Sequence, residues 1–161
     1  MRILGIDPGL NITGYGIIDD ATLSVVEAGI IKTRGRRPIQ ERLDEIFSSV
    51  SELIAEYKPG VLVLEKIYSH YKHPTTAILM GHARGAVCLA CGVHAVKLVN
   101  YPSTRIKKCI TGNGHASKAQ VQRMVQSLLK LKKAPEPVDV SDALAMALSY
   151  IYNKEHAAIP T

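Results

Sequence analysis

Four carboxylates in this chain stand at the ends of apolar segments, where together they could hold divalent metal ions. Asp7 ends the segment RILGID, Glu65 ends VLVLE, and Asp139 and Asp142 open VDVSDALAMAL. Carboxylates that lie close together repel one another unless cations lie between them, and hard oxygen ligands of this kind suit Mg²⁺ or Mn²⁺. The pattern therefore indicates a metal-dependent phosphodiesterase.

Three of the acids also have a purely structural explanation. Asp7 precedes a Pro-Gly pair and could be a turn former that accepts hydrogen bonds from nearby backbone amides. Asp139 and Asp142 could cap a helix, because the positive end of the helix dipole favours acids. Their spacing of three also places both carboxylates on one face of a first helical turn. Glu65 follows a continuous apolar run, at the strand end where α/β sheets place their ligands. The joint placement of the four favours a metal site.

The elements that carry these acids predict one α/β domain. Apolar patterning and turn signals predict strands at 2–7, 12–19, 23–32, 61–65 and 94–99, and helices at 38–57, 75–91, 117–131 and 140–153. We read the stretch 101–115 as a basic, loop-rich connection. An antiparallel meander followed by alternating helices and strands predicts a mixed five-stranded central sheet flanked by helices. The domain is expected to span 1–153, with a flexible tail over 154–161.

The composition is typical of one globular domain with a polyanionic partner. The chain has 161 residues, 47% of them hydrophobic, and a formal charge of +6, which favours nucleic acid as the partner. Three cysteines do not predict a disulfide framework, and Cys88 and Cys91 with His94 lack a second ligand pair for zinc, so buried thiols are favoured. With no signal-like start and no apolar run of spanning length, we expect a cytoplasmic protein without membrane contact.

Cationic and aromatic side chains alternate directly after Glu65, in KIYSHYKHP. Tyr68 and Tyr71 could stack on exposed bases while Lys66 and Lys72 contact phosphates, a combination that suits unpaired or distorted nucleic acid. The alternative is a solvated loop with ordinary tyrosines.

The motifs GIDPGLNITGYGII, LEKIYS, GHARGAV, IKKCITGNGHASKAQVQRMVQ and VSDALAMAL resemble, in order, those of the RuvC family of Holliday junction resolvases. The resemblance covers nearly the whole chain. It implies an RNase H-like fold in which Asp7, Glu65, Asp139 and Asp142 are the catalytic, metal-binding acids. Two Mg²⁺ ions about 3.5 to 4 Å apart, replaceable by Mn²⁺, would activate water and stabilise the leaving oxygen.

The resemblance also implies a substrate and partners. The expected activity is paired nicking of four-way DNA junctions in recombination and repair, by a homodimer formed through helix 75–91, with a RuvA–RuvB type complex as a further partner. Basic residues similar to those of the family near the junction backbone are Arg105, Lys107, Lys108 and Lys118. Lys118 would open a helix whose amino end favours phosphate. The family usually has Phe at the position of Tyr68 and an acid or amide at that of Lys66, departures that concern substrate handling.

Two charge runs, Arg34 with Arg36 and Arg37, and Lys130 with Lys132 and Lys133, are interpreted as solvated surface. Two other functions stay open. One is a junction-binding protein with the same fold and little or no activity. The other is an actin-like phosphotransferase, suggested by the Asp-Pro-Gly motif alone, although the chain lacks a second glycine-rich phosphate loop.

Overall fold

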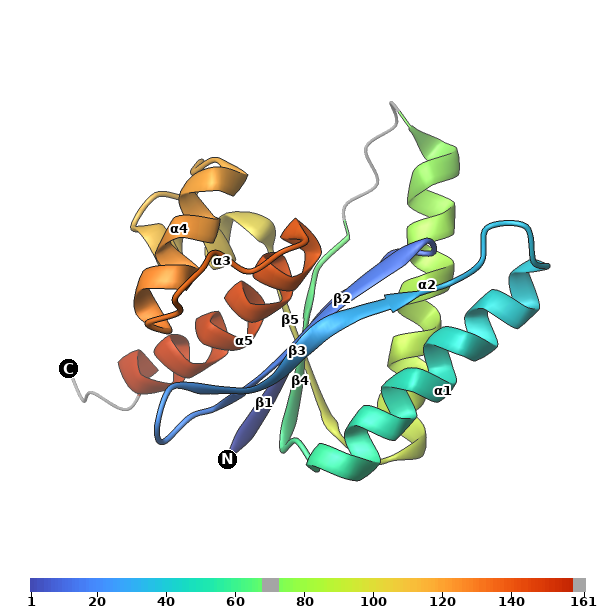
Figure 1. The fold of residues 1–161 in the computed structure, drawn as a ribbon, viewed down its shortest axis with the longest axis horizontal. Helices are drawn as coiled ribbons and strands as arrows, with labels where there is room; N and C mark the ends of the chain where they lie inside the picture. The colour runs from blue at the N-terminus through green and yellow to red at the C-terminus, as the bar shows by residue number, and fades with distance from the viewer. Residues whose placement is uncertain (68–72, 158–161) are drawn as a thin grey trace.

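A five-stranded sheet of order β3-β2-β1-β4-β5 forms the centre of the molecule in the computed structural model (Figure 1). The structure describes residues 1–67 and 73–157, the last three of these by their backbone alone. The strands are β1 (Arg2–Asp7), β2 (Ile12–Asp19), β3 (Ser24–Lys32), β4 (Val61–Glu65) and β5 (Lys97–Tyr101). The helices are α1 (Ile39–Tyr57), α2 (Pro74–Val93), α3 (Ser103–Thr111), α4 (Lys118–Leu128) and α5 (Val138–Ala157).

The sheet is mixed, as predicted. Strand β2 pairs antiparallel with both β1 and β3, whereas β4 pairs parallel with both β1 and β5. In the β1–β4 ladder Ile6 lies opposite Leu64, so Asp7 and Glu65 both follow at the carboxyl ends of neighbouring strands. Parallel pairing therefore brings two acids from distant parts of the sequence to one edge of the sheet.

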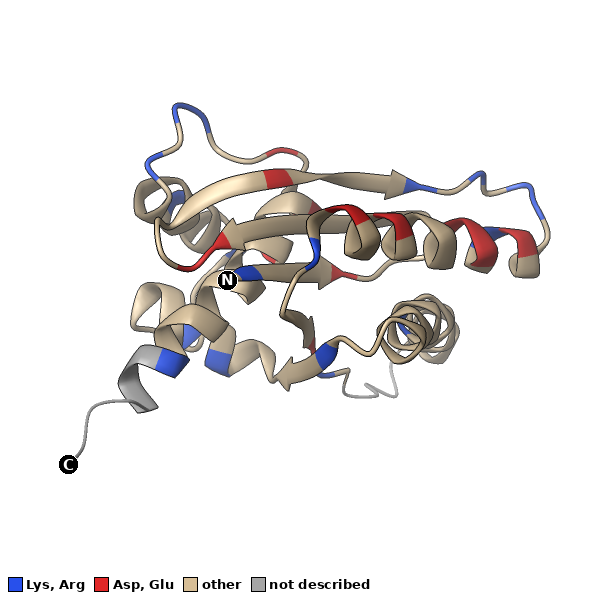
Figure 2. Cartoon of the chain, turned by 90° about the horizontal axis from the view of Figure 1, so that it is seen from below, with Lys and Arg blue, Asp and Glu red and all other residues tan. Residues whose placement is uncertain are grey.

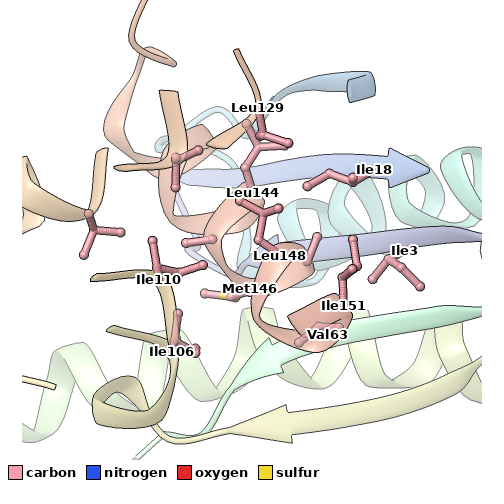
Figure 3. Packing of buried hydrophobic residues seen from close by; sticks show 14 of the residues in the cluster. Ile3, Ile18, Val63, Ile106, Ile110, Leu129, Leu144, Met146, Leu148 and Ile151 are labelled. Carbon is pink, nitrogen blue, oxygen red and sulfur yellow. The ribbon is translucent and has the colours of Figure 1, made fainter. Parts of the chain in front are cut away.

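Helices α1 and α2 cover one face of the sheet, and α3, α4 and α5 cover the other (Figure 1). Because successive strand residues point to opposite faces, β1 contributes Leu4 and Ile6 to the core under α1 and α2, and Ile3 to the core under α5. The core under α5 includes Leu144 and Leu148 of that helix and joins α3, α4 and α5 to the sheet (Figure 3).

Helix α5 approaches the sheet closely because glycines face it. A Cβ added at Gly5 would lie 1.9 Å from the Ala143 carbonyl oxygen, and one added at Gly14 would lie 2.2 Å from the Asp139 carbonyl oxygen. Ala143 itself is fully buried at this contact. Glycines on β1 and β2 and the buried Ala143 thus let this helix approach the sheet.

One predicted loop is a helix. The stretch 101–115 contains α3, which begins after Pro102 and ends at Gly112, a residue in the left-handed conformation. Ile106 and Ile110, one helical turn apart, are buried in the core with α5. The prediction was wrong because two buried side chains among many polar ones give a weak periodic signal, and tertiary packing completes the helix.

Two predicted boundaries also need correction. Strand β5 begins at Lys97 and not at 94, because α2 and a turn with Ala95 at positive φ occupy the preceding residues. Helix α5 runs from Val138 to Ala157, where the sequence predicted a helix over 140–153, and the Lys154 ammonium donates a hydrogen bond to Asp20. Residues 158–161 of the predicted tail lie outside the described residues.

Helix α2 is more apolar than the sequence reading allowed. Its length and a mean hydropathy of 1.4 over 18 residues would suffice, by those measures alone, to cross a membrane, so the expectation that no apolar run approaches spanning length is wrong. Ala83, Val87 and Cys91 are nevertheless buried in the core against the sheet. The prediction of buried thiols is confirmed for Cys91, while Cys88 is half-buried.

Candidate active site

Three of the four predicted acids line one hollow of about 510 Å³. Asp7 and Glu65 reach it from the ends of β1 and β4, and Asp142 reaches it from the first turns of α5. Lys66, Lys107 and Lys118 stand on its wall, and the remaining wall is largely apolar, including Met80, Ile106, Val121 and Met146. The hollow therefore combines acids, cations and a low-polarity lining.

Asp139 lies beside this hollow and not on its lining. It belongs to the first turn of α5 and contacts Gly14, the residue that pairs with Asp7 across the β1–β2 ladder. Its negative charge acts on Asp7, which places it in the same electrostatic neighbourhood. The fold thus gathers all four acids at one edge of the sheet.

Burial and neighbouring charge raise the pKa of Asp7 from 3.8 to about 7. Desolvation is the largest cause, followed by the negative charges of Asp142 and Asp139, while the Lys118 ammonium lowers the pKa. A carboxylate in such surroundings is stabilised by any cation that binds among these acids. Asp7 is therefore poised to take a positive ligand.

Glu65 is held by two contacts that the sequence reading missed. Burial raises its pKa, and a hydrogen bond from the Ser103 hydroxyl acts in the opposite direction. The Arg84 side chain of α2 donates to the Glu65 backbone carbonyl at 3.5 Å and also to the Asn100 side chain. Ser103 lies two residues after the end of β5, which is the one sequence signal that could have pointed to it.

The Lys118 ammonium donates to Asp142 Oδ2 at 3.1 Å. The negative charge of Asp142 is the main reason that the pKa of Lys118 is raised, with Asp7 and Asp139 adding to it. Lys118 opens α4, whose amino end is fixed by a capping box between Ser117 and Gln120. A cation is thus built into the acidic site from a separate helix.

The donor set fits a hard divalent cation, because it consists of carboxylate oxygens from three elements around one hollow. In the described part of the chain no three acidic, histidine or cysteine side chains are close enough to share one ion as they stand. Asp142 is turned toward Lys118 in this arrangement. Asp7, Glu65 and Asp142, with Asp139 beside them, are the residues that would hold the metal.

The predicted DNA-binding residues divide into groups. Lys66, Lys107 and Lys118 line the hollow. Arg105 instead donates to Asn153 on α5 and stacks on the Tyr101 ring, 4.8 Å from its centroid.

The other predicted contacts lie elsewhere. Lys108 is exposed and is not part of the lining. Tyr68, Tyr71 and Lys72 lie outside the described residues.

The acids lie at the adjoining ends of β1 and β4 and in the first turns of α5. Together with the mixed sheet of order β3-β2-β1-β4-β5, they define a nuclease of the RNase H-like fold. The family model of the crossover junction endodeoxyribonuclease RuvC matches residues 3–150. The chain belongs to the RuvC family, whose members are metal-dependent nucleases.

Individual relatives agree with this assignment. A crossover junction endodeoxyribonuclease RuvC of Rhodopirellula baltica is 49% identical over 148 residues, covering 91% of this chain and 83% of the relative. The Thermus thermophilus RuvC structure superposes with a TM-score of 0.88 at 31% identity, covering 98% of this chain and 97% of the other. The same protein in complex with a Holliday junction substrate gives a TM-score of 0.88 at 28% identity, over 97% and 96% of the two chains.

Proposed function

We propose that this protein is an endonuclease that makes paired nicks in four-way DNA junctions during recombination and repair. The observation that carries the proposal is the convergence of Asp7, Glu65 and Asp142 on one hollow that also presents Lys107 and Lys118. The relative from Thermus thermophilus that superposes on nearly the whole chain has a Holliday junction as its bound substrate. A cytoplasmic location, where such DNA is found, belongs to the same proposal.

Two Mg²⁺ ions, replaceable by Mn²⁺, are the cofactors that we assign to this site. When bound, they would supply a polarised water nucleophile and positive charge for the leaving oxygen. Asp7, Glu65, Asp139 and Asp142 would hold them, since each provides hard oxygen ligands. Lys107 and Lys118 face the same hollow and would hold the phosphate that is cut.

A homodimer is the assembly that suits a substrate with two equivalent strands to cut, because twofold symmetry supplies two sites. The outer face of α2 supports this part of the proposal. Ile78, Leu89 and Val93 are 61%, 58% and 62% exposed, an unusual apolar display on one helix. A RuvA–RuvB type branch-migration complex is the further partner that family membership supports.

The proposal is tested with purified protein on a four-way junction, a linear duplex of the same sequence and a single strand, each with Mg²⁺ or with chelator. We expect symmetric nicks in the junction only, and only with Mg²⁺. The Asp7→Asn variant should bind the junction without cutting it. Tight junction binding by the wild type with no cleavage under Mg²⁺ or Mn²⁺ would support a binding protein instead.

A further inference from the structure

The loop between β3 and α1 carries three exposed arginines, Arg34, Arg36 and Arg37, which we call the arginine loop. Arg37 pairs with Glu45 at 3.2 Å and with Glu41 at 3.9 Å. Within the part of the chain that the structure describes, Arg34 and Arg36 form no ion pair. Two guanidinium groups therefore face solvent without a neutralising acid.

We propose that the arginine loop binds the phosphate backbone of a duplex arm of the junction, next to the strand being cut. This inference rests on the proposed nuclease function and adds a contact site to it. It also replaces the interpretation of Arg34 and Arg36 as mere solvated surface.

The arginine loop lies at the same edge of the sheet as Asp7. Strands β1 and β3 both pair antiparallel with β2, so they run in the same direction and end at the same edge of the sheet. In the ladders Asp7 lies opposite Gly14, and Lys32 at the end of β3 lies opposite Ile12. Two strand spacings, about 10 Å, separate β1 from β3. Figure 2 shows the basic residues gathered beyond the end of β3.

Buried polar contacts fix the arginine loop to the segment that follows Asp7. Thr33 is only 5% exposed and its hydroxyl donates to the Leu10 carbonyl. Arg42 of α1, 8% exposed, donates to the Thr33 hydroxyl and to the Leu10 carbonyl, each at 3.0 Å. The Thr33 backbone amide donates to the Asn11 carbonyl at 3.1 Å. The loop is therefore anchored relative to Asp7, which reduces the ordering entropy lost when it binds a ligand.

The chemistry of the exposed groups matches a DNA backbone. Guanidinium groups bind phosphate oxygens in a bidentate way and keep their charge at any working pH. One turn of duplex is about 34 Å long, so an arm that places a phosphate at Asp7 can extend the distance of about 10 Å across to β3 and the further distance of about 7 Å along it to Lys32, where the loop begins. A duplex arm is thus long enough to touch both places at once.

The second charge run lies elsewhere, which makes it a matched control. Lys132 and Lys133 are exposed and follow the carboxyl end of α4, whereas Lys118 at its amino end contacts the active site. A helix of 11 residues places these two ends about 16 Å apart. The two runs look alike in the sequence, but the arginine loop follows β3 at the edge of the sheet that carries Asp7, whereas the lysine run follows the end of α4 remote from Lys118.

The test compares Arg34→Gln/Arg36→Gln with Lys132→Gln/Lys133→Gln, which removes the same charge. Junction affinity is measured in chelator across a series of salt concentrations. We expect the arginine variant to weaken binding on the order of tenfold per lost contact at 0.1 M salt, and to reduce the salt slope by about 0.9 per contact. The lysine variant should keep the wild-type salt slope to within about 0.45, which is half of the change expected for one lost contact. Arg34→Lys/Arg36→Lys should keep most of the slope, because it preserves the charge.

The outcomes separate this inference from the proposed function. Equal slopes for the arginine variant and the lysine control, with a wild type that cuts junctions, would overturn the inference alone. A wild type that neither binds nor cuts junctions would overturn the proposed function. Thermal melting of each variant checks folding, and the exposure of all four side chains predicts unchanged midpoints.

Discussion

Replacing Gly14 with alanine should slow cleavage strongly while leaving the protein folded. The new Cβ would lie 2.2 Å from the Asp139 carbonyl oxygen and 2.8 Å from its Cβ, closer than real Cβ contacts allow. The first turn of α5 must therefore move away by about 1 Å, and misplacement of a catalytic group by that distance lowers a rate about 100-fold. Overpacking of this kind also destabilises by about 1 to 3 kcal/mol.

The assay is single-turnover cleavage of a four-way junction with enzyme in excess, together with junction binding in chelator and thermal melting. Gly14→Ala should bind the junction nearly as the wild type does, cut it about 100-fold more slowly, and melt about 3 to 10 °C lower. Gly35→Ala is the control, because nothing lies within 4 Å of a Cβ at that position. A folded Gly14→Ala protein that cuts at the wild-type rate would refute the claim that α5 positions Asp139 through this contact.

Three further changes have defined outcomes. Because the pKa of Asp7 is raised to about 7, folding takes up a proton between pH 4 and 7, and the metal-free protein loses stability as pH rises through that range. Asp7→Asn should therefore be more stable than the wild type at pH 8, by on the order of 4 kcal/mol at most, with no such advantage near pH 4. If the free energy of unfolding, measured by urea denaturation, changed with pH equally in the two proteins, this prediction would be contradicted. Arg42→Met should lower the free energy of unfolding by about 1 to 3 kcal/mol, because the Thr33 hydroxyl loses its buried donor and the Leu10 carbonyl keeps only the Thr33 hydroxyl. An unchanged urea midpoint would show that the network contributes nothing. Leu89→Lys on the outer face of α2 should yield monomers in sedimentation velocity without lowering the melting temperature, and a stable dimer of this variant would move the interface elsewhere.

The sheet and its acids could be predicted because both leave local signals. Continuous or alternating apolar runs predict strands, and a charged residue at the end of such a run can be recognised from the sequence alone. This signal predicts Asp7 and Glu65 as site residues, and the parallel pairing of β1 with β4 brings the two acids together.

The remaining features depend on contacts between segments far apart in the sequence. The ion pair of Lys118 with Asp142 joins residues 24 positions apart, and the hydrogen bond of Arg42 to Leu10 joins residues 32 positions apart. Helix α3 depends on the burial of two isoleucines against α5, which no local pattern expresses strongly. The different surroundings of the two charge runs follow from the topology, which places one run after the end of β3 and the other after the end of α4.

The most direct test of the metal site is anomalous diffraction from crystals soaked in Mn²⁺, collected at the manganese absorption edge. We expect anomalous peaks in the hollow among Asp7, Glu65 and Asp142, with Lys118 released from Asp142 and Asp139 turned toward the ions. An empty hollow in crystals that hold Mn²⁺ elsewhere, with the Lys118 ion pair intact, would contradict metal-dependent cleavage at this site.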